Sequence, residues 1–392
     1  MRIIFITSKL NLETAGGSVP DLEIKARFFS SLGHNVTIVT LFSSANKLET
    51  VINPNFKIIE ENINTKKMYT IQSGVYKILK KYENSTDIFH VEGQFLYGVG
   101  IYKIFGGKIP NILFFNRELV SWPNPSEINF KDQSSLWRTA KRKIRFWLEK
   151  YFGTHLGNCH DYSIFTCPQL HDAFHNFGIK KPPFSVISDF VDIEKLKKTS
   201  TIQARSVEEA SIQKEKFHVL CSGRMIPAKG FDLVINAISQ IKNKEKLKVT
   251  ISGDGPEMNN LKSLASSLNV DKYISFPGWI SRQEFLSLMA SADFFIQPKW
   301  RRELTSVILL EAMAFNLPCI VPAGGGTAWV TSGAALNFVD NDPKSLAEKI
   351  SEIIENPTLR FKLANNCISR LSELDYHNLG EEMEAIMKSL IT

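Results

Sequence analysis

Two cations in the second half of the sequence have the residue types and the spacing to bind an anionic ligand. Arg224 and Lys229 lie in the glycine-bearing segment from Gly223 to Gly230, between an apolar run and an amphipathic run. Glycines let a backbone approach a ligand closely at such a turn. An Arg and a Lys in one loop are suited to neutralise a diphosphate, with charge-assisted hydrogen bonds worth about 1.5–3 kcal/mol each. The alternative is that both are solvated cations on an ordinary loop.

A second candidate anion site lies further along the chain, at a predicted helix start. Thr305 or Ser306 is placed to cap a helix that continues through Ala314. The free amides of Thr305, Ser306 and Val307 would then form an anion site at the helix N-terminus. Glu303 precedes this helix, in the loop that leads into it.

Glu311 is the other carboxylate of this region, separated from Glu303 by seven residues and inside the predicted helix. It lies among leucine, alanine and methionine, and a carboxylate in so apolar a stretch is costly unless something hydrogen-bonds it. A ribose diol would do so. The alternative is a structural ion pair with Arg301 or Arg302.

The elements that would position these residues alternate between short apolar runs and amphipathic runs. Strands are predicted at 3–7, 35–41, 88–91, 112–115, 217–222, 249–253, 273–276, 294–297 and 319–321. Helices are predicted near 20–32, 134–152, 231–241, 257–268, 281–290, 306–315 and 343–355. Residues 195–216 are predicted to be a linker or a surface excursion. The pattern predicts an α/β fold with two doubly wound Rossmann-like domains that face a central ligand cleft.

Composition limits the class of protein. The 392 residues are 43% hydrophobic and 22% charged, which suffices for two packed cores and excludes a disordered chain. Lys and Arg number 47 against 40 Asp and Glu, and this net charge of +7 suits phosphorylated metabolites, nucleic acid or an anionic membrane alike. Five cysteines without a close Cys-x-x-Cys pair argue against a zinc site and for a reducing compartment. No apolar run has the length of a signal peptide or a membrane span.

A basic helix is predicted at 134–152. Within residues 138–150 the cations Arg138, Lys141, Arg142, Lys143, Arg145 and Lys150 outnumber the single acid Glu149. Apolar and aromatic residues recur between them at helical spacing. One interpretation is docking on anionic lipid, with about 1 kcal/mol from each cation near the surface. The other is a buried aromatic stripe with a solvated basic face. No recognised nucleic-acid-binding module accompanies this helix, so nucleic acid is not expected as a partner.

At this point the sequence resembles the retaining family-4 glycosyltransferases, which have the two-domain GT-B fold. The resemblance covers nearly the whole chain, and the joint order and spacing of its motifs are specific. The motifs are Gly16-Gly17, Asp87-Ile88-Phe89-His90, Val186 to Asp192, Gly223-Arg224 with Lys229-Gly230, Gly253-Asp254-Gly255-Pro256, Phe276-Pro277-Gly278-Trp279, Glu303 with Glu311-Ala312-Met313-Ala314, and Gly324-Gly325-Gly326.

The resemblance implies a role for individual residues. Arg224 and Lys229 would hold the nucleotide diphosphate, and Glu311 the ribose hydroxyls. Glu303 would contact the donor sugar, with the amides of Thr305 and Ser306 nearby. The remaining implied site residues line the donor: Gly16, Gly17, Gly223, Gly253, Gly255, Gly278, Trp279 and Val307. Residues 1–190 would bind the acceptor, residues 191–374 would bind the nucleotide sugar, and a C-terminal helix at about 375–392 would pack back on the first domain.

Some positions depart from the family pattern. The family often has His-x-His where this chain has His90-Val91-Glu92. His90 and Glu92 are therefore kept as candidate catalytic residues, with the alternative that His90 packs behind the site. Asp340-Asn341-Asp342 imitates a metal-binding Asp-x-Asp, but Asp342 precedes Pro343 and is better placed as a helix N-cap. Because two cations and a helix dipole can replace a divalent ion, neither a metal nor any other cofactor is expected.

The implied function is transfer of a sugar from a UDP- or GDP-linked donor to a hydroxyl of a glycan or glycolipid, with retention of anomeric configuration. Bacterial lipopolysaccharide, O-antigen or capsule assembly is the expected setting. The expected location is cytoplasmic and peripheral on the inner face of the plasma membrane. The alternatives are a soluble transferase that makes a small glycoside and an inactive subunit that binds nucleotide sugar. A nicotinamide dehydrogenase is disfavoured because the first strand lacks a Gly-x-Gly-x-x-Gly turn.

Overall fold

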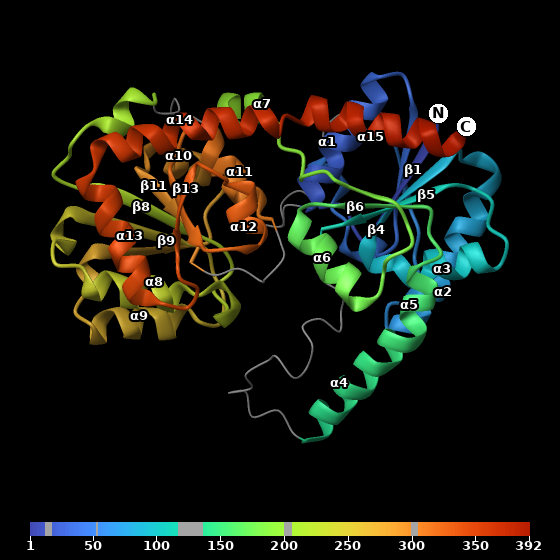
Figure 1. The fold of residues 1–392 in the computed structure, drawn as a ribbon, viewed down its shortest axis with the longest axis horizontal. Helices are drawn as coiled ribbons and strands as arrows, with labels where there is room; N and C mark the ends of the chain where they lie inside the picture. Colours follow the sequence, from blue (N-terminus) through green and yellow to red (C-terminus); the bar gives the residue numbers. More distant parts are fainter. Residues whose placement is uncertain (12–17, 52–53, 117–135, 200–205, 299–304) are drawn as a thin grey trace. The chain divides into compact units, whose positions relative to one another are not determined.

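The chain forms two compact units. The computed structural model describes residues 1–11, 18–51, 54–116, 136–199, 206–298 and 305–392. Unit 1 comprises Met1–Phe190 and Tyr376–Thr392, and unit 2 comprises Val191–Asp375 (Figure 1). Each unit contains one parallel sheet, so the predicted α/β class with two doubly wound domains is confirmed.

Unit 1 is built on a seven-stranded sheet in the order β3-β2-β1-β4-β5-β6-β7. All its strand pairs are parallel. The strands run outward from β1 to β3 and then restart at β4 on the other side of β1, so the topological switch point lies between β1 and β4. The strands are β1 (Arg2–Thr7), β2 (Asn35–Thr40), β3 (Lys57–Glu60), β4 (Ile88–Glu92), β5 (Asn111–Phe115), β6 (Tyr162–Phe165) and β7 (Phe184–Val186).

Helices cover both faces of this sheet. On one side, α1 and the C-terminal helix α15 pack together (Figure 1). Gly380 of α15 lies against the ring of Phe28. On the other side are α2 and α3 (Figure 1), which meet where Gly98 lies against Val75. The helices are α1 (Ser18–Ser31), α2 (Met68–Tyr82), α3 (Leu96–Ile104), α4 (Leu136–Leu148), α5 (Thr154–Gly157), α6 (Pro168–Phe177) and α15 (Tyr376–Ile391).

Unit 2 is built on a six-stranded parallel sheet in the order β10-β9-β8-β11-β12-β13, with its switch point between β8 and β11. Alternate residues of a strand face opposite sides. Along β8, Val219 and Cys221 accordingly belong to one hydrophobic core and Leu220 to another. The strands are β8 (Phe217–Ser222), β9 (Leu247–Ser252), β10 (Ile274–Gly278), β11 (Phe294–Ile296), β12 (Cys319–Pro322) and β13 (Ala335–Phe338).

The helices of unit 2 supply the other half of each core. Helices α8, α9 and α13 pack on the face of Val219, and α7, α10, α11 and α14 pack on the face of Leu220. The helices are α7 (Ile193–Thr199), α8 (Phe231–Gln240), α9 (Met258–Ser267), α10 (Arg282–Ser291), α11 (Val307–Ala314), α12 (Gly325–Val330), α13 (Pro343–Glu355) and α14 (Pro357–Glu373). Among the helices described in the two units, none is both long and apolar enough to cross a bilayer.

The segment predicted as a linker, 195–216, differs from that prediction in its described part. Its first residues belong to α7, which packs on unit 2. Its last residues are held by the buried guanidinium of Arg360, which donates to the carbonyl oxygens of Ala210 and Ile212 at 2.9 and 3.1 Å. Its polar composition suggested a segment exposed to solvent. Instead, the buried Arg360 of α14 donates hydrogen bonds to backbone carbonyl oxygens of this segment and so holds the segment against α14.

Candidate functional site

The predicted ligand-binding residues of unit 2 follow the two strands that flank its switch point. Residues 223–230 come directly after β8, and Thr305 to Val307 lead from β11 into α11. In open α/β sheets, ligands bind outside the carboxyl ends of the strands at a switch point. The topology therefore places both candidate anion-binding segments at the same edge of the sheet.

The loops after β8, β9 and β10 pack backbone against backbone at this edge. A Cβ on Gly253 would lie 2.0 Å from the carbonyl oxygen of Gly223, and a Cβ on Gly255 would lie 2.4 Å from that of Met225. The Gly253 amide donates to the carbonyl oxygen of Gly278 at 2.9 Å. Both Gly253 and Gly255 have positive φ values, +126° and +155°. Side chains are excluded here by contact and by backbone conformation, so the three predicted glycine turns form one structure.

The two candidate cations lie in the first of these loops. Arg224 is exposed, and Lys229 ends a single 3-10 turn before Gly230, which has φ +67° and precedes α8. The side chain of Lys229 runs past Gly223, since a Cβ on that glycine would lie 3.7 Å from the Lys229 Cδ and Cε atoms. One arginine and one lysine are thus presented from a loop whose backbone is fixed by its neighbours.

The helix start predicted at 305–307 is present. Helix α11 begins at Val307 with Ser306 in the N-cap position, but the Ser306 hydroxyl makes no capping hydrogen bond. First-turn amides have no partner within their own helix. Binding of an anion there remains a prediction.

Glu311 lies in the middle of α11 and already has a partner. It is 8% exposed. Arg282, the first residue of α10, donates from Nη2 to Oε1 at 2.6 Å and from Nη1 to Oε2 at 3.1 Å. The predicted alternative of an ion pair is therefore seen, with Arg282 as the partner. Arg301 and Arg302, which the sequence suggested, lie outside the described residues.

The segment predicted to border a base leads from β10 to α10. Gly278 has φ +80° and open space around its Cα, and the Trp279 side chain is 58% exposed. Ser281 then caps α10 by accepting from the Glu284 amide, while the Glu284 carboxylate accepts from the Ser281 amide. This capping box fixes the start of the helix that carries Arg282.

The candidate residues of unit 1 lie on β4, beside its switch point, and differ in environment. His90 is 3% exposed and packs between Phe5 and Phe114, with ring centroids 4.7 and 5.5 Å away. Burial holds the pKa of His90 well below the usual value, and its Nε2 has no hydrogen-bond partner among the described residues. Glu92 ends the strand and accepts hydrogen bonds from Thr7 and Gln94. The position of His90 agrees with the alternative in which it packs behind the site.

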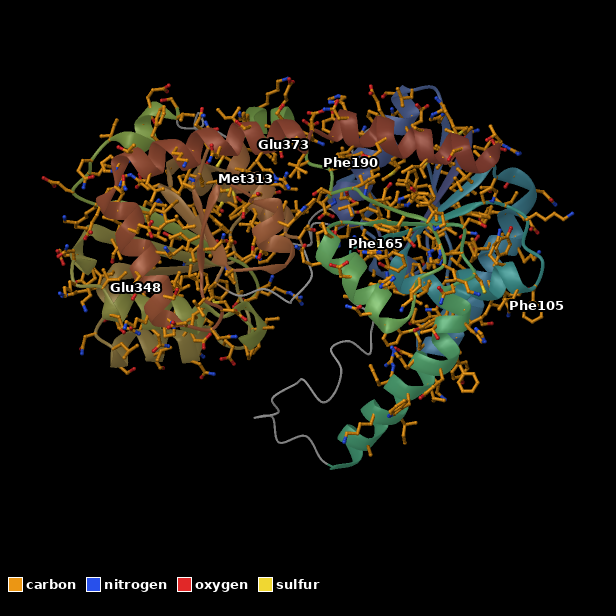
Figure 2. All side chains as sticks on the ribbon, viewed as in Figure 1. Phe105, Phe165, Phe190, Met313, Glu348 and Glu373 are labelled. Carbon is orange, nitrogen blue, oxygen red and sulfur yellow. The ribbon has the colours of Figure 1, made fainter. Side chains whose placement is uncertain are left out.

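A buried ion pair on α1 had not been predicted. The Lys25 ammonium donates to Asp21 at 2.7 Å and lies 3.3 Å from the centre of the Phe114 ring. Burial lowers the pKa of Lys25 and raises the pKa of Asp21, while their mutual attraction opposes both shifts. Asp21 also accepts from the amide of Phe190, the last residue of unit 1 before the chain passes into unit 2 (Figure 2). The only available signal was an Asp and a Lys four residues apart in an apolar helix.

Three predicted site residues, Gly16, Gly17 and Glu303, lie outside the described residues. Asp342 accepts from the Lys344 amide at 2.9 Å and caps α13, with Pro343 in the first turn, as expected for an N-cap. Metal independence remains a prediction.

The predicted basic helix has an exposed apolar face. Helix α4 and the π-turn at Glu149–Gly153 place five apolar residues at positions i, i+3, i+4, i+7 and i+8, and all are more than half exposed. These residues, called here the aromatic face, are Ile144, Trp147, Leu148, Tyr151 and Phe152. The rings of Trp147 and Tyr151 stack at 5.2 Å. The interpretation as a buried stripe is therefore wrong for Ile144, Trp147, Leu148 and Tyr151.

The opposite side of this helix attaches it to unit 1. Lys150 donates to the carbonyl oxygen of Phe177 at 2.6 Å, and the Phe146 and Phe177 rings lie 5.9 Å apart. Arg145 pairs with Glu149 at 2.9 Å, and Lys143 is exposed. Helix α4 thus extends from unit 1 (Figure 1), and Lys143 and Arg145 lie beside an aromatic face whose residues are more than half exposed.

Comparison with known proteins finds that this chain is similar to glycosyltransferases. Residues 203–370 match the family described as glycosyl transferases group 1. A GDP-mannose-dependent phosphatidylinositol monomannoside mannosyltransferase of Corynebacterium glutamicum is 27% identical over 180 residues, 44% of this chain and 47% of that protein. The lipopolysaccharide core biosynthesis glycosyltransferase LpsE of Rhizobium meliloti is 26% identical over 251 residues, 63% of this chain and 68% of that protein. The chain thus spans about half the length of the first relative.

A solved structure, that of Anabaena HepE with UDP and glucose, superposes on all of this chain and all of that chain with a TM-score of 0.73 at 17% identity. Identity this low supports the fold alone, and that fold is GT-B. The resemblance carried by the sequence motifs is confirmed to this extent: the chain has the GT-B fold, and residues 203–370 of its second unit match the group 1 glycosyltransferases.

Proposed function

We propose that this protein is a retaining, metal-independent glycosyltransferase that moves a sugar from a UDP- or GDP-linked donor to a hydroxyl of a glycan or glycolipid. One observation supports it most directly. Arg224, Lys229 and the start of α11 follow the two strands at the switch point of unit 2, within the segment that matches the group 1 family. Cations and helix amides at such a position suit a pyrophosphate.

The chemistry of transfer fits these residue types. The bond between the anomeric carbon and the donor phosphate oxygen breaks, and a bond to the acceptor oxygen forms on the same face of the sugar. The acceptor proton passes to the leaving phosphate oxygen. Negative charge grows on the diphosphate as this happens, and Arg224 and Lys229 stabilise it in a fixed arrangement. Glu303, by the family resemblance, orients the donor sugar.

The setting that we propose is surface-glycan assembly, lipopolysaccharide in particular. Support comes from one relative named for lipopolysaccharide core biosynthesis and another named for a phosphatidylinositol mannoside. Both names refer to glycans that are joined to lipid. An acceptor of this kind is reached most easily by a protein that rests on the membrane.

The donor is tested by a thermal-shift screen with UDP, GDP and ADP, followed by the corresponding sugar nucleotides. A ligand that binds only the folded state increases the unfolding free energy according to its excess over Kd, by about 2.7 kcal/mol at a 100-fold excess, and so raises the melting temperature. We expect UDP or GDP to raise the melting temperature. We also expect the protein to transfer the sugar of the matching sugar nucleotide to a glycolipid extract, and NMR of the product to show the anomeric configuration of the donor. Nucleotide binding without transfer to any acceptor would favour an inactive subunit instead.

We also propose that the aromatic face of α4 docks unit 1 on an anionic membrane at the inner face of the plasma membrane. Five exposed apolar residues at helical spacing, beside Lys143 and Arg145, match the amphipathic helices that lie in a membrane interface. Tryptophan and tyrosine favour that interface, since their rings have an apolar body and a polar edge. Each nearby cation adds about 1 kcal/mol on an anionic surface.

Vesicle flotation tests this docking. Trp147→Ser with Phe152→Ser should abolish flotation with phosphatidylglycerol vesicles, and Lys143→Glu should weaken it. Phe105→Ser is the matched control, because Phe105 is 68% exposed in the same unit but lies apart from α4 (Figure 2). Flotation that the double variant leaves unchanged, or that is equal on neutral phosphatidylcholine vesicles, would count against docking by this face.

A further inference from the structure

The carboxylate predicted to hold the ribose is occupied by another residue of the same unit. Both oxygens of Glu311 accept hydrogen bonds from the two terminal nitrogens of Arg282. The two side chains differ in their exposure to solvent. The Glu311 side chain is 10% exposed and belongs to a buried part of α11, whereas the Arg282 side chain is 50% exposed at the start of α10. Of the two, Arg282 is the one able to leave.

A guanidinium and a vicinal diol bind a carboxylate in the same way. Two parallel N–H groups of the guanidinium donate one hydrogen bond to each carboxylate oxygen, which is a bidentate interaction. The 2′- and 3′-hydroxyls of a ribose offer two neighbouring O–H donors to the same pair of oxygens. A nucleotide that uses both Glu311 oxygens therefore competes with Arg282.

The structure also shows why leaving costs Arg282 little. The ribose hydroxyls replace Arg282 as partners of the buried carboxylate, so only the Arg282 side chain, which is half open to water, loses its partner. The pairing of an exposed cation contributes little, about two- to fivefold in an equilibrium constant. The long Arg282 side chain can turn into water, and the charge is solvated there.

We propose that Arg282 is a ribose-subsite residue that competes with the nucleotide for Glu311 and so sets how tightly the ribose diol is held. The proposal rests on the function proposed above. In the free protein Arg282 keeps the buried carboxylate paired. When the nucleoside diphosphate is bound, Arg282 gives up at least one of its two hydrogen bonds, and it takes Glu311 back when the product leaves.

Calorimetric titration with UDP and GDP tests the proposal on the full chain. The variants are Arg282→Gln, Arg282→Lys, Glu311→Gln and the double variant Arg282→Gln/Glu311→Gln. Lys349→Gln is the matched control, since it removes the cation from an exposed ion pair of the same unit, Lys349–Glu352. We expect Arg282→Gln to bind the preferred nucleotide two- to fivefold tighter, Arg282→Lys to gain less because one ammonium cannot form the bidentate interaction, and Lys349→Gln to match wild type.

The 2′-deoxy form of the same nucleotide separates competition from a general effect on the fold. With one hydroxyl missing, the gain from Arg282→Gln should shrink toward onefold, and in the Glu311→Gln background it should vanish. Unchanged or weaker binding by Arg282→Gln, or an equal gain with the deoxy nucleotide, would overturn the role given to Arg282. Absence of binding by the wild-type chain to either nucleotide would instead overturn the proposed function, and this inference with it.

Discussion

Replacing Gly253 by alanine tests whether the glycine loops of unit 2 form one structure. Two costs arise. A φ of +126° is strained for alanine, by about 1–2 kcal/mol. The new Cβ would also lie 2.0 Å from the carbonyl oxygen of Gly223, which is backbone and cannot rotate away. The loops after β8 and β9 must therefore part.

Parting the loops breaks hydrogen bonds from the Gly223 amide to Ser252 at 3.0 Å and from the Gly253 amide to Gly278 at 2.9 Å. At about 1 kcal/mol each, these bring the expected loss of unfolding free energy to about 3–4 kcal/mol. Gly278→Ala is the matched control, because Gly278 also has positive φ but open space, so only the strain of about 1 kcal/mol remains. Urea unfolding measures both variants. Equal losses for the two would refute the close approach of the loops.

Three further outcomes are expected. Arg360→Met should destabilise unit 2 by about 3 kcal/mol in urea unfolding, because buried carbonyl oxygens, among them that of Ala210, lose their donor; a loss below 1 kcal/mol would contradict this. Burial lowers the pKa of His160 to about 3, so the unfolded state takes up a proton below about pH 6.5 while the folded state does not. His160 should thus lower the unfolding free energy by about 1 kcal/mol between pH 7 and 5.5. His160→Gln should remove this contribution to the pH dependence, whereas His155→Gln, at an exposed site, should not. Removal of residues 379–392 should destabilise unit 1 by about 5 kcal/mol by uncovering Phe28 and the partners of the buried Met383, and an unchanged melting temperature would show that α15 is dispensable.

Sequence pattern predicted the central strands well and the short outer strands poorly. Phe217–Ser222 was predicted to the residue, because a continuous apolar run is typical of a strand buried on both faces. Strands β3, β6, β7 and β13 were not predicted, and each has three or four residues. Strands β3, β7 and β13 are edge strands, where burial on both faces is not required, and β6 lies beside β7. None of these strands has an apolar run long enough to be recognised in the sequence, and only their pairing in the sheet identifies them.

The sequence pattern could not predict which side chains pair when they lie on elements that are far apart in the chain. The glycine turns and the two cations could be placed on one sheet edge, because the carboxyl ends of parallel strands meet there. The partner of Glu311 could not be predicted: Arg282 is 29 residues away on another helix, and nearer arginines were equally plausible partners. The aromatic face of α4 was predicted as a pattern, but periodicity alone could not tell an exposed apolar face from a buried one.

The central claim is that Arg224 and Lys229 bind the diphosphate of a nucleotide, and titration of nucleoside diphosphates measures it most directly. UDP and GDP are titrated into wild type, Arg224→Ala, Lys229→Ala and the control Lys349→Gln. Loss of one charge-assisted hydrogen bond, worth about 1.5–3 kcal/mol, predicts a Kd about 10- to 100-fold weaker for each single variant. The control should bind as wild type does. Unchanged affinity in both alanine variants would contradict the account.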